Sequence, residues 1–287
     1  MTKQKHKEGF LLVASMHNHY KNSAIQCIES LEDYYDNPKV MVACHPEWVE
    51  DFKRLDSVIK VVSDNFPISV RSKLWALQHT PFEKTCYLDA DMEIVDDEIE
   101  RVFDLLDDNH DCAFTVIDPN TGATTAIYTE DGEAGIRDND KEKHLRYHGG
   151  FFLWWNNDKH PNAQKAMNLW WTEYLNINAN NEFWENHPEI YFKNRAWDQF
   201  TWWWIHQKLI PDLKIQEIEN NNKYEMLRWN WNHYMSENSH GGLSPIIKHH
   251  PINRGLLNQT PGLYLEDEYQ PGTGPGGNPV WEWKLLN

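Results

Sequence analysis

Two aspartates separated by a single residue form the most chemically suggestive pair in the chain. Asp89 and Asp91 directly follow the apolar run 85–88, which has the composition of a short buried strand. Carboxylates this close repel each other and lose hydration, and a divalent cation relieves both effects. Mg²⁺ and Mn²⁺ prefer such oxygen ligands and also bind phosphate oxygens. The pair therefore indicates a metal site, although a strand ending in an acidic turn is the alternative, because Asp-x-Asp alone is a weak motif.

The elements that would position this pair alternate between strand and helix from the start of the chain. Apolar runs predict buried strands, and amphipathic stretches between them predict helices, the first capped by Asn22 or Ser23. This alternation is typical of a doubly wound, mostly parallel α/β sheet. The strands are expected at 10–14, 39–44, 58–62 and 85–88, and later helices at 46–55 and 70–78.

Polar residues follow several of these expected strands. In parallel sheets, ligands bind outside the carboxyl ends of the strands. Residues 15–19, Asp64 with Asn65, and the Asp89–Asp91 pair are therefore expected to meet in one crevice. No GxGxxG or GxxxxGK[ST] pattern follows these strands, which disfavours dinucleotide-binding and P-loop sites.

The second half of the chain offers further candidate polar groups. Gly149 and Gly150 permit close approach of the backbone to a ligand, with an ordinary turn before a strand as the alternative. Asp198 either caps a helix or, with Gln199, presents a carboxylate and an amide to a polar substrate. His249 and His250 end a short apolar run and suit a metal or a phosphate, or else face solvent.

Composition limits the classes of function. The 287 residues carry a formal charge of −17, which argues against a general nucleic-acid surface. The chain has no run of 18 apolar residues that would predict a membrane span, and residues 1–8 do not resemble a signal peptide. The four cysteines show no CxxC spacing and are expected to be reduced core residues of a cytoplasmic protein. Of the 15 tryptophans, all but Trp48 and Trp75 lie at or beyond Trp154.

Five segments, taken in order, carry a resemblance to a known family. They are RSKLWAL at 71–77, YLDADM at 87–92, HGGFF at 148–152, WDQ at 197–199 and IKH at 247–249. Together they resemble the GT-A-fold glycosyltransferases, especially the nucleotide-sugar-dependent enzymes of the glycogenin and lipopolysaccharide galactosyltransferase kind. The resemblance spans roughly 10–254. The chain departs from the family pattern in having His148 where Asn is usual and in lacking the HxxGxxKPW motif, which leaves donor sugar and stereochemistry open.

The resemblance implies roles for particular residues. A cation, Mn²⁺ or Mg²⁺, would bind Asp89, Asp91 and a histidine and would bridge the donor diphosphate. The histidine would be His249, with His250 as the alternative. The implied roles are metal binding by Asp89, Asp91 and His249; contacts to donor sugar or phosphate by Arg71, Lys73 and Arg254; the nucleobase or ribose site near Ser15 and Asp64; the donor-sugar pocket along Gly149 and Gly150; and the transferred sugar or acceptor hydroxyl at Asp198 and Gln199.

The resemblance also implies an organisation of the chain. We expect a nucleotide-sugar-binding α/β half at 1–117, a polar excursion at 118–147, an acceptor-side half of the same GT-A domain at 148–255, and a Gly/Pro-rich tail at 256–287.

The implied function is a metal-dependent glycosyltransferase that uses a nucleoside-diphosphate sugar, UDP-sugar first among them. Its acceptor would be a hydroxyl on a glycan, a protein or a modified nucleobase, and the oligomeric state is left open. Inversion would need a base such as Asp198, whereas retention would need Asp198 or Gln199 to stabilise an oxocarbenium-like centre. The alternatives are a non-catalytic carbohydrate-binding protein with a transferase-like fold and an Asp-x-Asp phosphatase, whose acidic pair would normally follow the first strand.

Overall fold

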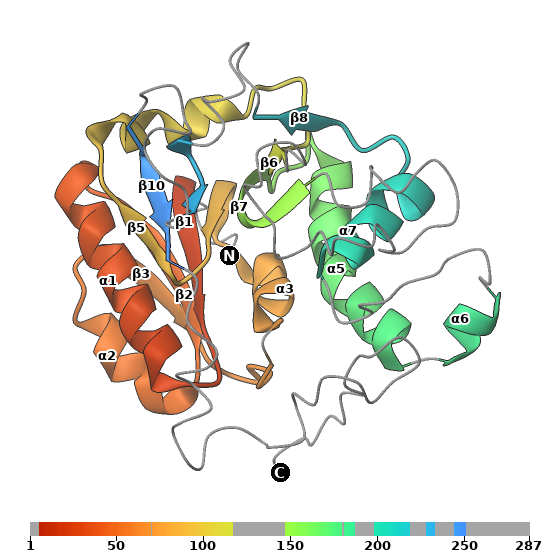
Figure 1. Cartoon of the computed structure of the whole chain (residues 1–287), viewed down its shortest axis with the longest axis horizontal. Helices are drawn as coiled ribbons and strands as arrows, with labels where there is room; N and C mark the ends of the chain where they lie inside the picture. The colour runs from red at the N-terminus through yellow and green to blue at the C-terminus, as the bar shows by residue number, and fades with distance from the viewer. Residues whose placement is uncertain are drawn as a thin grey trace.

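The computed structural model describes residues 6–69, 71–116, 147–179, 181–186, 198–218, 228–232 and 244–250 (Figure 1). All of the expected excursion at 118–147 except Tyr147 lies outside these ranges, as do the tail at 256–287 and Arg254. Among the described helices, none is both long and apolar enough to cross a membrane.

One mixed, mostly parallel sheet organises the described chain. Seven strands pair in the order β3-β2-β1-β4-β7-β6-β8. Neighbouring strands are parallel except where β7 pairs antiparallel with β4 and with β6. This confirms the predicted α/β class. The strands are β1 (His6–Ala14), β2 (Val40–Cys44), β3 (Val58–Val62), β4 (Phe82–Leu88), β6 (Cys112–Val116), β7 (Tyr147–Trp155) and β8 (Ile215–Glu217).

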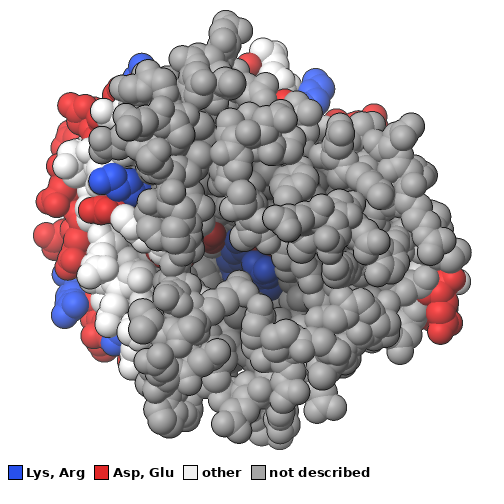
Figure 2. All heavy atoms as spheres, viewed as in Figure 1, with Lys and Arg blue, Asp and Glu red and all other residues white. Residues whose placement is uncertain are grey.

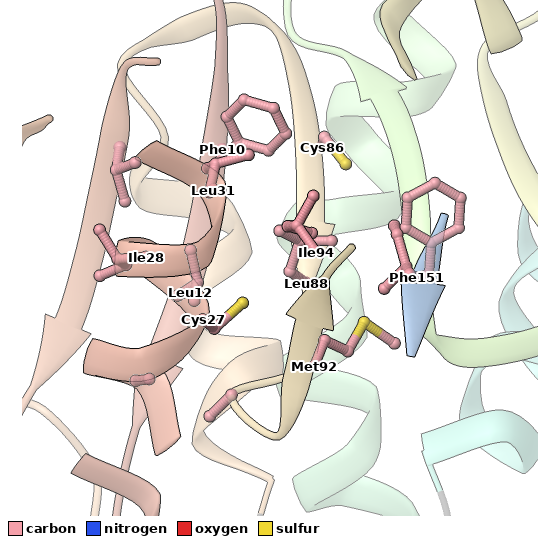
Figure 3. Close-up of a cluster of buried hydrophobic side chains, with 14 of the residues drawn as sticks. Phe10, Leu12, Cys27, Ile28, Leu31, Cys86, Leu88, Met92, Ile94 and Phe151 are labelled. Carbon is pink, nitrogen blue, oxygen red and sulfur yellow. The ribbon is translucent and has the colours of Figure 1, made fainter. Parts of the chain in front are cut away.

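The central strand β1 is buried on both faces, which explains its unbroken apolar sequence. Phe10 and Leu12 pack on one face against α1 (Asn18–Tyr34), and Leu11 and Val13 pack on the other. Figure 3 shows Phe10 and Leu12 beside Ile28 and Leu31 of α1. The second face is covered by α3 (Ser72–Ala76), α5 (Pro161–Ala179) and α7 (Asp198–Trp204) (Figure 1).

Aromatic residues of the second half fill this second face. Trp154, Trp170 and Trp202 are buried in one cluster, while Trp203 packs with Phe183 of α6 (Asn181–Asn186). Of the three consecutive tryptophans 202–204, two are buried and Trp204 is half-buried.

A second, three-stranded sheet returns the end of the described chain to the centre. It has the order β5-β10-β9, with β5 (Met92–Ile94), β9 (Trp231–Asn232) and β10 (Ile247–His249). β10 runs antiparallel to β5 and places His249 opposite Met92. His249 is thereby brought next to the acidic pair, although it lies more than 150 positions later in the sequence.

Several predicted boundaries were wrong for local reasons. α1 begins at Asn18 rather than at Asn22 or Ser23, because the His17 ring accepts a hydrogen bond from the His19 N–H and caps the helix. Met16, at φ 68°, turns the chain directly out of β1. Gly149 and Gly150 lie inside β7 rather than in a turn before it.

The predicted helices between strands are shorter than expected. Residues 46–55 form a 3-10 turn at Pro46–Trp48 followed by α2 (Val49–Lys53), and α3 passes into a 3-10 turn at Leu77–His79. A 3-10 helix, Asp97–Leu105, follows β5. Because helices this short are not stable in isolation, these elements depend mostly on tertiary packing for their stability.

The four cysteines confirm one prediction from the sequence. Cys27, Cys44, Cys86 and Cys112 are all buried and none forms a disulfide. Burial raises the pKa of the Cys27 thiol well above its usual range, with further contributions from Asp91 and Asp89. These thiols act as small apolar core groups.

Packing around β1 predicts a measurable loss of stability on truncation. Leu12→Ala would open a cavity among fully buried side chains, and we expect a loss of about 3 kcal/mol in the free energy of unfolding, measured by urea denaturation. The control is Ile59→Ala on edge strand β3, since this side chain is 37% exposed and should cost about 1 kcal/mol or less. Equal losses for the two variants would contradict the described core.

Candidate active site

The acidic pair lies in the turn between β4 and β5. The Asp89 N–H donates to the Gly150 carbonyl (2.9 Å), and the Met92 N–H donates back to the Asp89 carbonyl (3.2 Å). The Tyr87 hydroxyl, two residues earlier in β4, donates to Asp89 Oδ1 (2.7 Å). The backbone and a buried phenol thus hold the Asp89 carboxylate at the carboxyl end of a central strand.

His249 completes a three-residue group with the acidic pair. Asp89, Asp91 and His249 each offer one ligand atom, and these three atoms lie within 4.8 Å of one another. His249 Nε2 is 3.3 Å from Asp91 Oδ1. His250 lies apart from this group, with its Nε2 2.7 Å from Glu93 Oε2. The structure therefore favours His249 over His250 as the third candidate ligand.

Asn230 orients the His249 ring. The His249 Nδ1 is 3.2 Å from Asn230 Oδ1, so a proton on Nδ1 can be donated to the amide oxygen, which directs Nε2 toward the carboxylates. Burial disfavours charge on His249, but the hydrogen bond and charge of Asp91 outweigh it and raise the pKa of this imidazole. Two carboxylates and one oriented imidazole are a donor set that fits a divalent cation such as Mn²⁺ or Mg²⁺.

Buried Lys73 and half-buried Arg71 bracket a third carboxylate beside this group. Lys73 Nζ is 2.8 Å from Asp198 Oδ2 and 3.4 Å from Asp89 Oδ1, and it donates to the Gly149 carbonyl at 2.9 Å. Arg71 contributes a longer ion pair of 3.3 Å to Asp198 Oδ1. The Asp198 side chain is only 5% exposed. Burial opposes its ionisation, but Arg71 and Lys73 hold the pKa of Asp198 well below its usual range.

Both glycines of β7 are required by the closeness of these carboxylates. A Cβ at Gly149 would lie 2.9 Å from Asp198 Oδ2, and one at Gly150 would lie 2.8 Å from Asp89 Oδ2. Real side chains do not tolerate such approaches, so any larger residue would displace a carboxylate. The predicted close approach at these glycines is observed, but it is to the protein's own acidic groups.

His148 extends the polar cluster on its other side. Its Nδ1 accepts from the Gly150 N–H (3.0 Å), and its ring meets that of His249 edge-on at 5.6 Å between centroids. Burial, aided by His249 and Lys73, lowers the pKa of His148 to about 3. The imidazole is thus neutral at physiological pH.

The remaining predicted residues lie at different distances from this cluster. Ser15 directly follows β1, and its hydroxyl contacts the Ser69 carbonyl (3.0 Å) and the Ser72 hydroxyl (2.9 Å), which ties the end of β1 to α3. Gln199 is buried in the first turn of α7, next to Asp198. Asp64 is exposed beyond β3, at the sheet edge and away from β4.

Two supporting residues were missed in the sequence. Tyr87 belonged to the recognised segment but had no assigned role, although the two-residue strand period places it on the same side as Asp89. Asn230 had no sequence signal, because its role depends on the pairing of β9 with β10.

Figure 2 shows where positive charge gathers on one face of the molecule. Lys or Arg atoms appear at its centre, with acidic atoms beside them, in the region that Figure 1 assigns to α3 and the end of β4. This agrees with the cation-rich group formed by Lys73 and Arg71.

No protein-family model matches the chain, and no curated protein sequence matches it. Among solved structures, it is similar to the glycosyltransferase GlyE of Streptococcus pneumoniae TIGR4, with a TM-score of 0.49 and 12% identity over 85% of this chain and 55% of that one. The chain thus spans about half the length of the pneumococcal protein.

Two further similar structures are also glycosyltransferases. Mouse xyloside xylosyltransferase 1 has a TM-score of 0.47 and 12% identity, over 86% of this chain and 98% of that one. The galactosyltransferase LgtC, solved with donor and acceptor sugar analogues, has a TM-score of 0.44 and 14% identity, over 85% of this chain and 87% of that one. Because these values are low, the assignment of a reaction depends on the geometry of the site.

Orientation of His249 by Asn230 predicts an effect on metal binding. Asn230→Ala frees the imidazole to rotate, and we expect Mn²⁺ affinity to fall about 10-fold or more, measured by equilibrium titration. The matched control is Asn157→Ala, since the Asn157 side-chain oxygen accepts from the Lys159 N–H in the turn before α5 and its loss should leave the affinity unchanged. An unaltered affinity in Asn230→Ala would contradict the supporting role of this amide.

Proposed function

We propose that the protein is a metal-dependent glycosyltransferase that moves a sugar from a nucleoside-diphosphate sugar to an acceptor hydroxyl. The observation that carries the proposal is the juxtaposition of the Asp89–Asp91–His249 group with the cations Lys73 and Arg71. A cation-binding group beside two fixed positive charges suits a diphosphate, whose negative charge grows as the glycosidic C1–O bond breaks. The electron pair leaves with the diphosphate, the acceptor oxygen forms the new bond to C1, and the proton of the acceptor hydroxyl passes to the released diphosphate.

The roles follow from the contacts. Asp89, Asp91 and His249 would hold Mn²⁺ or Mg²⁺, which when bound acts as a Lewis acid on the leaving diphosphate. Lys73, with Arg71 beside it, would donate hydrogen bonds to oxygens of the sugar nucleotide. Outside the described residues, Arg254 is proposed as a further phosphate contact.

The other predicted residues keep proposed roles around this centre. Gly149 and Gly150 would line the donor-sugar pocket, and Gln199 would face the transferred sugar or the acceptor. Ser15 and Asp64 would mark the nucleobase or ribose side, with UDP the preferred carrier. The acceptor hydroxyl would belong to a glycan, a protein or a modified nucleobase.

Asp198 is better suited to positioning than to proton abstraction. A carboxylate held between two cations, with its pKa far below neutrality, is a poor general base. We therefore assign Asp198 to orienting Lys73 and Arg71 rather than to deprotonating the acceptor.

The pairing of strands supports the proposed organisation of the chain. β4 belongs to the proposed nucleotide-sugar half, 1–117, and β7 falls almost wholly in the acceptor-side half, 148–255. These strands are hydrogen-bonded neighbours from Lys84↔Trp155 to Leu88↔Phe151. This favours one domain made from both halves.

The phosphatase alternative fits the site less well. It needs an aspartate free to attack phosphorus after the first strand, whereas Asp89 follows β4 and its Oδ1 already accepts from Tyr87 and Lys73. A carbohydrate-binding protein without turnover is the second candidate, because the buried, polar cluster could hold a ligand without reacting it.

The proposal is tested by release of nucleoside diphosphate from a panel of sugar nucleotides, with and without Mn²⁺. Slow hydrolysis of the donor needs no known acceptor. We expect turnover of one donor that depends on Mn²⁺ and falls at least ~100-fold in Asp91→Ala, because the leaving diphosphate loses its stabilisation.

The control for this assay is Asp104→Ala, an exposed carboxylate far along the 3-10 helix, which should keep wild-type turnover. Binding of a sugar nucleotide without any turnover would favour the carbohydrate-binding alternative. No binding and no turnover of any donor by folded, metal-supplied protein would reject the transferase proposal.

The ion-paired state of Asp198 predicts both stability and pH behaviour. Asp198→Asn removes the negative charge that pairs with buried Lys73 and with Arg71, and we expect it to lower the free energy of unfolding by about 3 kcal/mol. Because the pKa of Asp198 is lowered in the folded state, its contribution is present above the ordinary Asp range and is lost only as pH falls through the lower, folded value.

Urea unfolding of wild type and Asp198→Asn at several pH values measures this contribution. The difference between the two proteins should be constant from pH 6 to 8 and should shrink under strongly acidic conditions. A difference that grows as pH falls would mean that Asp198 is not held as a carboxylate.

A further inference from the structure

Lys73 forms an ion pair with Asp89, one of the carboxylates that would bind the metal ion. Its ammonium group lies 3.4 Å from Asp89 Oδ1 while bound at 2.8 Å to Asp198. The Lys73 side chain is 11% exposed, and its third contact is the Gly149 carbonyl. The Lys73 ammonium group is therefore a fixed positive charge next to the candidate cation site.

The balance of charge in this group changes with what enters it. Among the described contacts, the carboxylates of Asp89, Asp91 and Asp198 face the cations Lys73 and Arg71. A divalent cation entering alone adds two positive charges beside Lys73 and must compete with it for Asp89. A divalent cation entering with a diphosphate adds little net charge, and the diphosphate oxygens offer Lys73 a new partner.

We propose that Lys73 is an internal counter-cation that keeps the affinity of the Asp89–Asp91–His249 group for a divalent cation low until a nucleoside diphosphate binds. The diphosphate then takes Lys73 from Asp89, so that metal and donor bind with positive coupling. This coupling is reciprocal, because each ligand raises the affinity for the other by the same factor. The inference rests on the proposed function, since it requires cation and diphosphate to bind at adjoining positions.

The test is an Mn²⁺ titration followed by electron paramagnetic resonance of free Mn²⁺, with and without saturating UDP. Mn²⁺ bound by UDP in solution is subtracted. Without UDP, we expect Lys73→Gln to bind Mn²⁺ about 10-fold more tightly than wild type, because the competing charge is gone. UDP should tighten Mn²⁺ binding less in Lys73→Gln than in wild type.

Three controls separate charge from shape. Lys73→Arg keeps the positive charge and should behave like wild type without UDP. Lys53→Gln removes a positive charge from an exposed ion pair with Glu50 and should leave Mn²⁺ affinity unchanged. Asp91→Ala should abolish binding, which shows that the titration reports this site.

Lys73→Gln that is folded by circular dichroism yet binds Mn²⁺ no more tightly than wild type overturns the inference. If this variant does not fold, the crystal structure of the wild type with Mn²⁺ and UDP decides. We expect Lys73 Nζ to contact a diphosphate oxygen and to have left Asp89, and an intact contact between Lys73 and Asp89 overturns the inference.

The outcomes distinguish this inference from the proposed function. Tighter Mn²⁺ binding in Lys73→Gln with weakened UDP coupling, but no turnover of any sugar nucleotide, upholds the inference and contradicts the reaction. Metal-dependent turnover with no effect of Lys73→Gln on Mn²⁺ affinity contradicts the inference and upholds the reaction.

Discussion

Electrostatic repulsion among carboxylates at the carboxyl end of β4 is the constraint on which the site depends. Asp89, Asp91 and Asp198 come together where hydration is limited, and such a group is stable only with positive charge among them. Lys73 and Arg71 supply part of that charge from α3 and the residue before it. A divalent cation between Asp89, Asp91 and His249 would supply the rest.

The backbone is shaped to permit this concentration of charge. β7 can approach Asp89 and Asp198 only because positions 149 and 150 carry no Cβ. The pairing of β10 with β5 brings His249 onto the same edge, and Asn230 orients its ring. The apolar packing of α1, β1 and β5, seen in Figure 3, holds the turn that carries the acidic pair.

Much of the fold was predictable because its determinants are local. Continuous apolar runs marked β1, β2 and β4, and their alternation with helices indicated a parallel sheet, which the strand order confirms. The helix boundaries were less predictable, since the start of α1 depends on a histidine cap and a left-handed residue, Met16, that no periodic pattern reveals.

The candidate site was predictable to the extent that its residues lie at strand ends. The convergence of Asp89, Asp91 and His249 is seen in the structure, whereas Asp64 lies at the sheet edge. The pairing of Asp198 with Lys73 and Arg71 could not be predicted, because it depends on how α7 packs against α3 through α5. Among the roles that the sequence left open for Asp198, that pairing argues against a base and for a group that orients Lys73 and Arg71.

The central claim is that Asp89, Asp91 and His249 together bind one divalent cation. Electron spin-echo spectroscopy of Mn²⁺-loaded protein tests it directly, because a coordinated imidazole nitrogen modulates the manganese signal. We predict nitrogen modulation in wild type and in His250→Gln, and its loss in His249→Gln. Modulation that persists in His249→Gln, or that is absent from Mn²⁺-loaded wild type, would contradict the account.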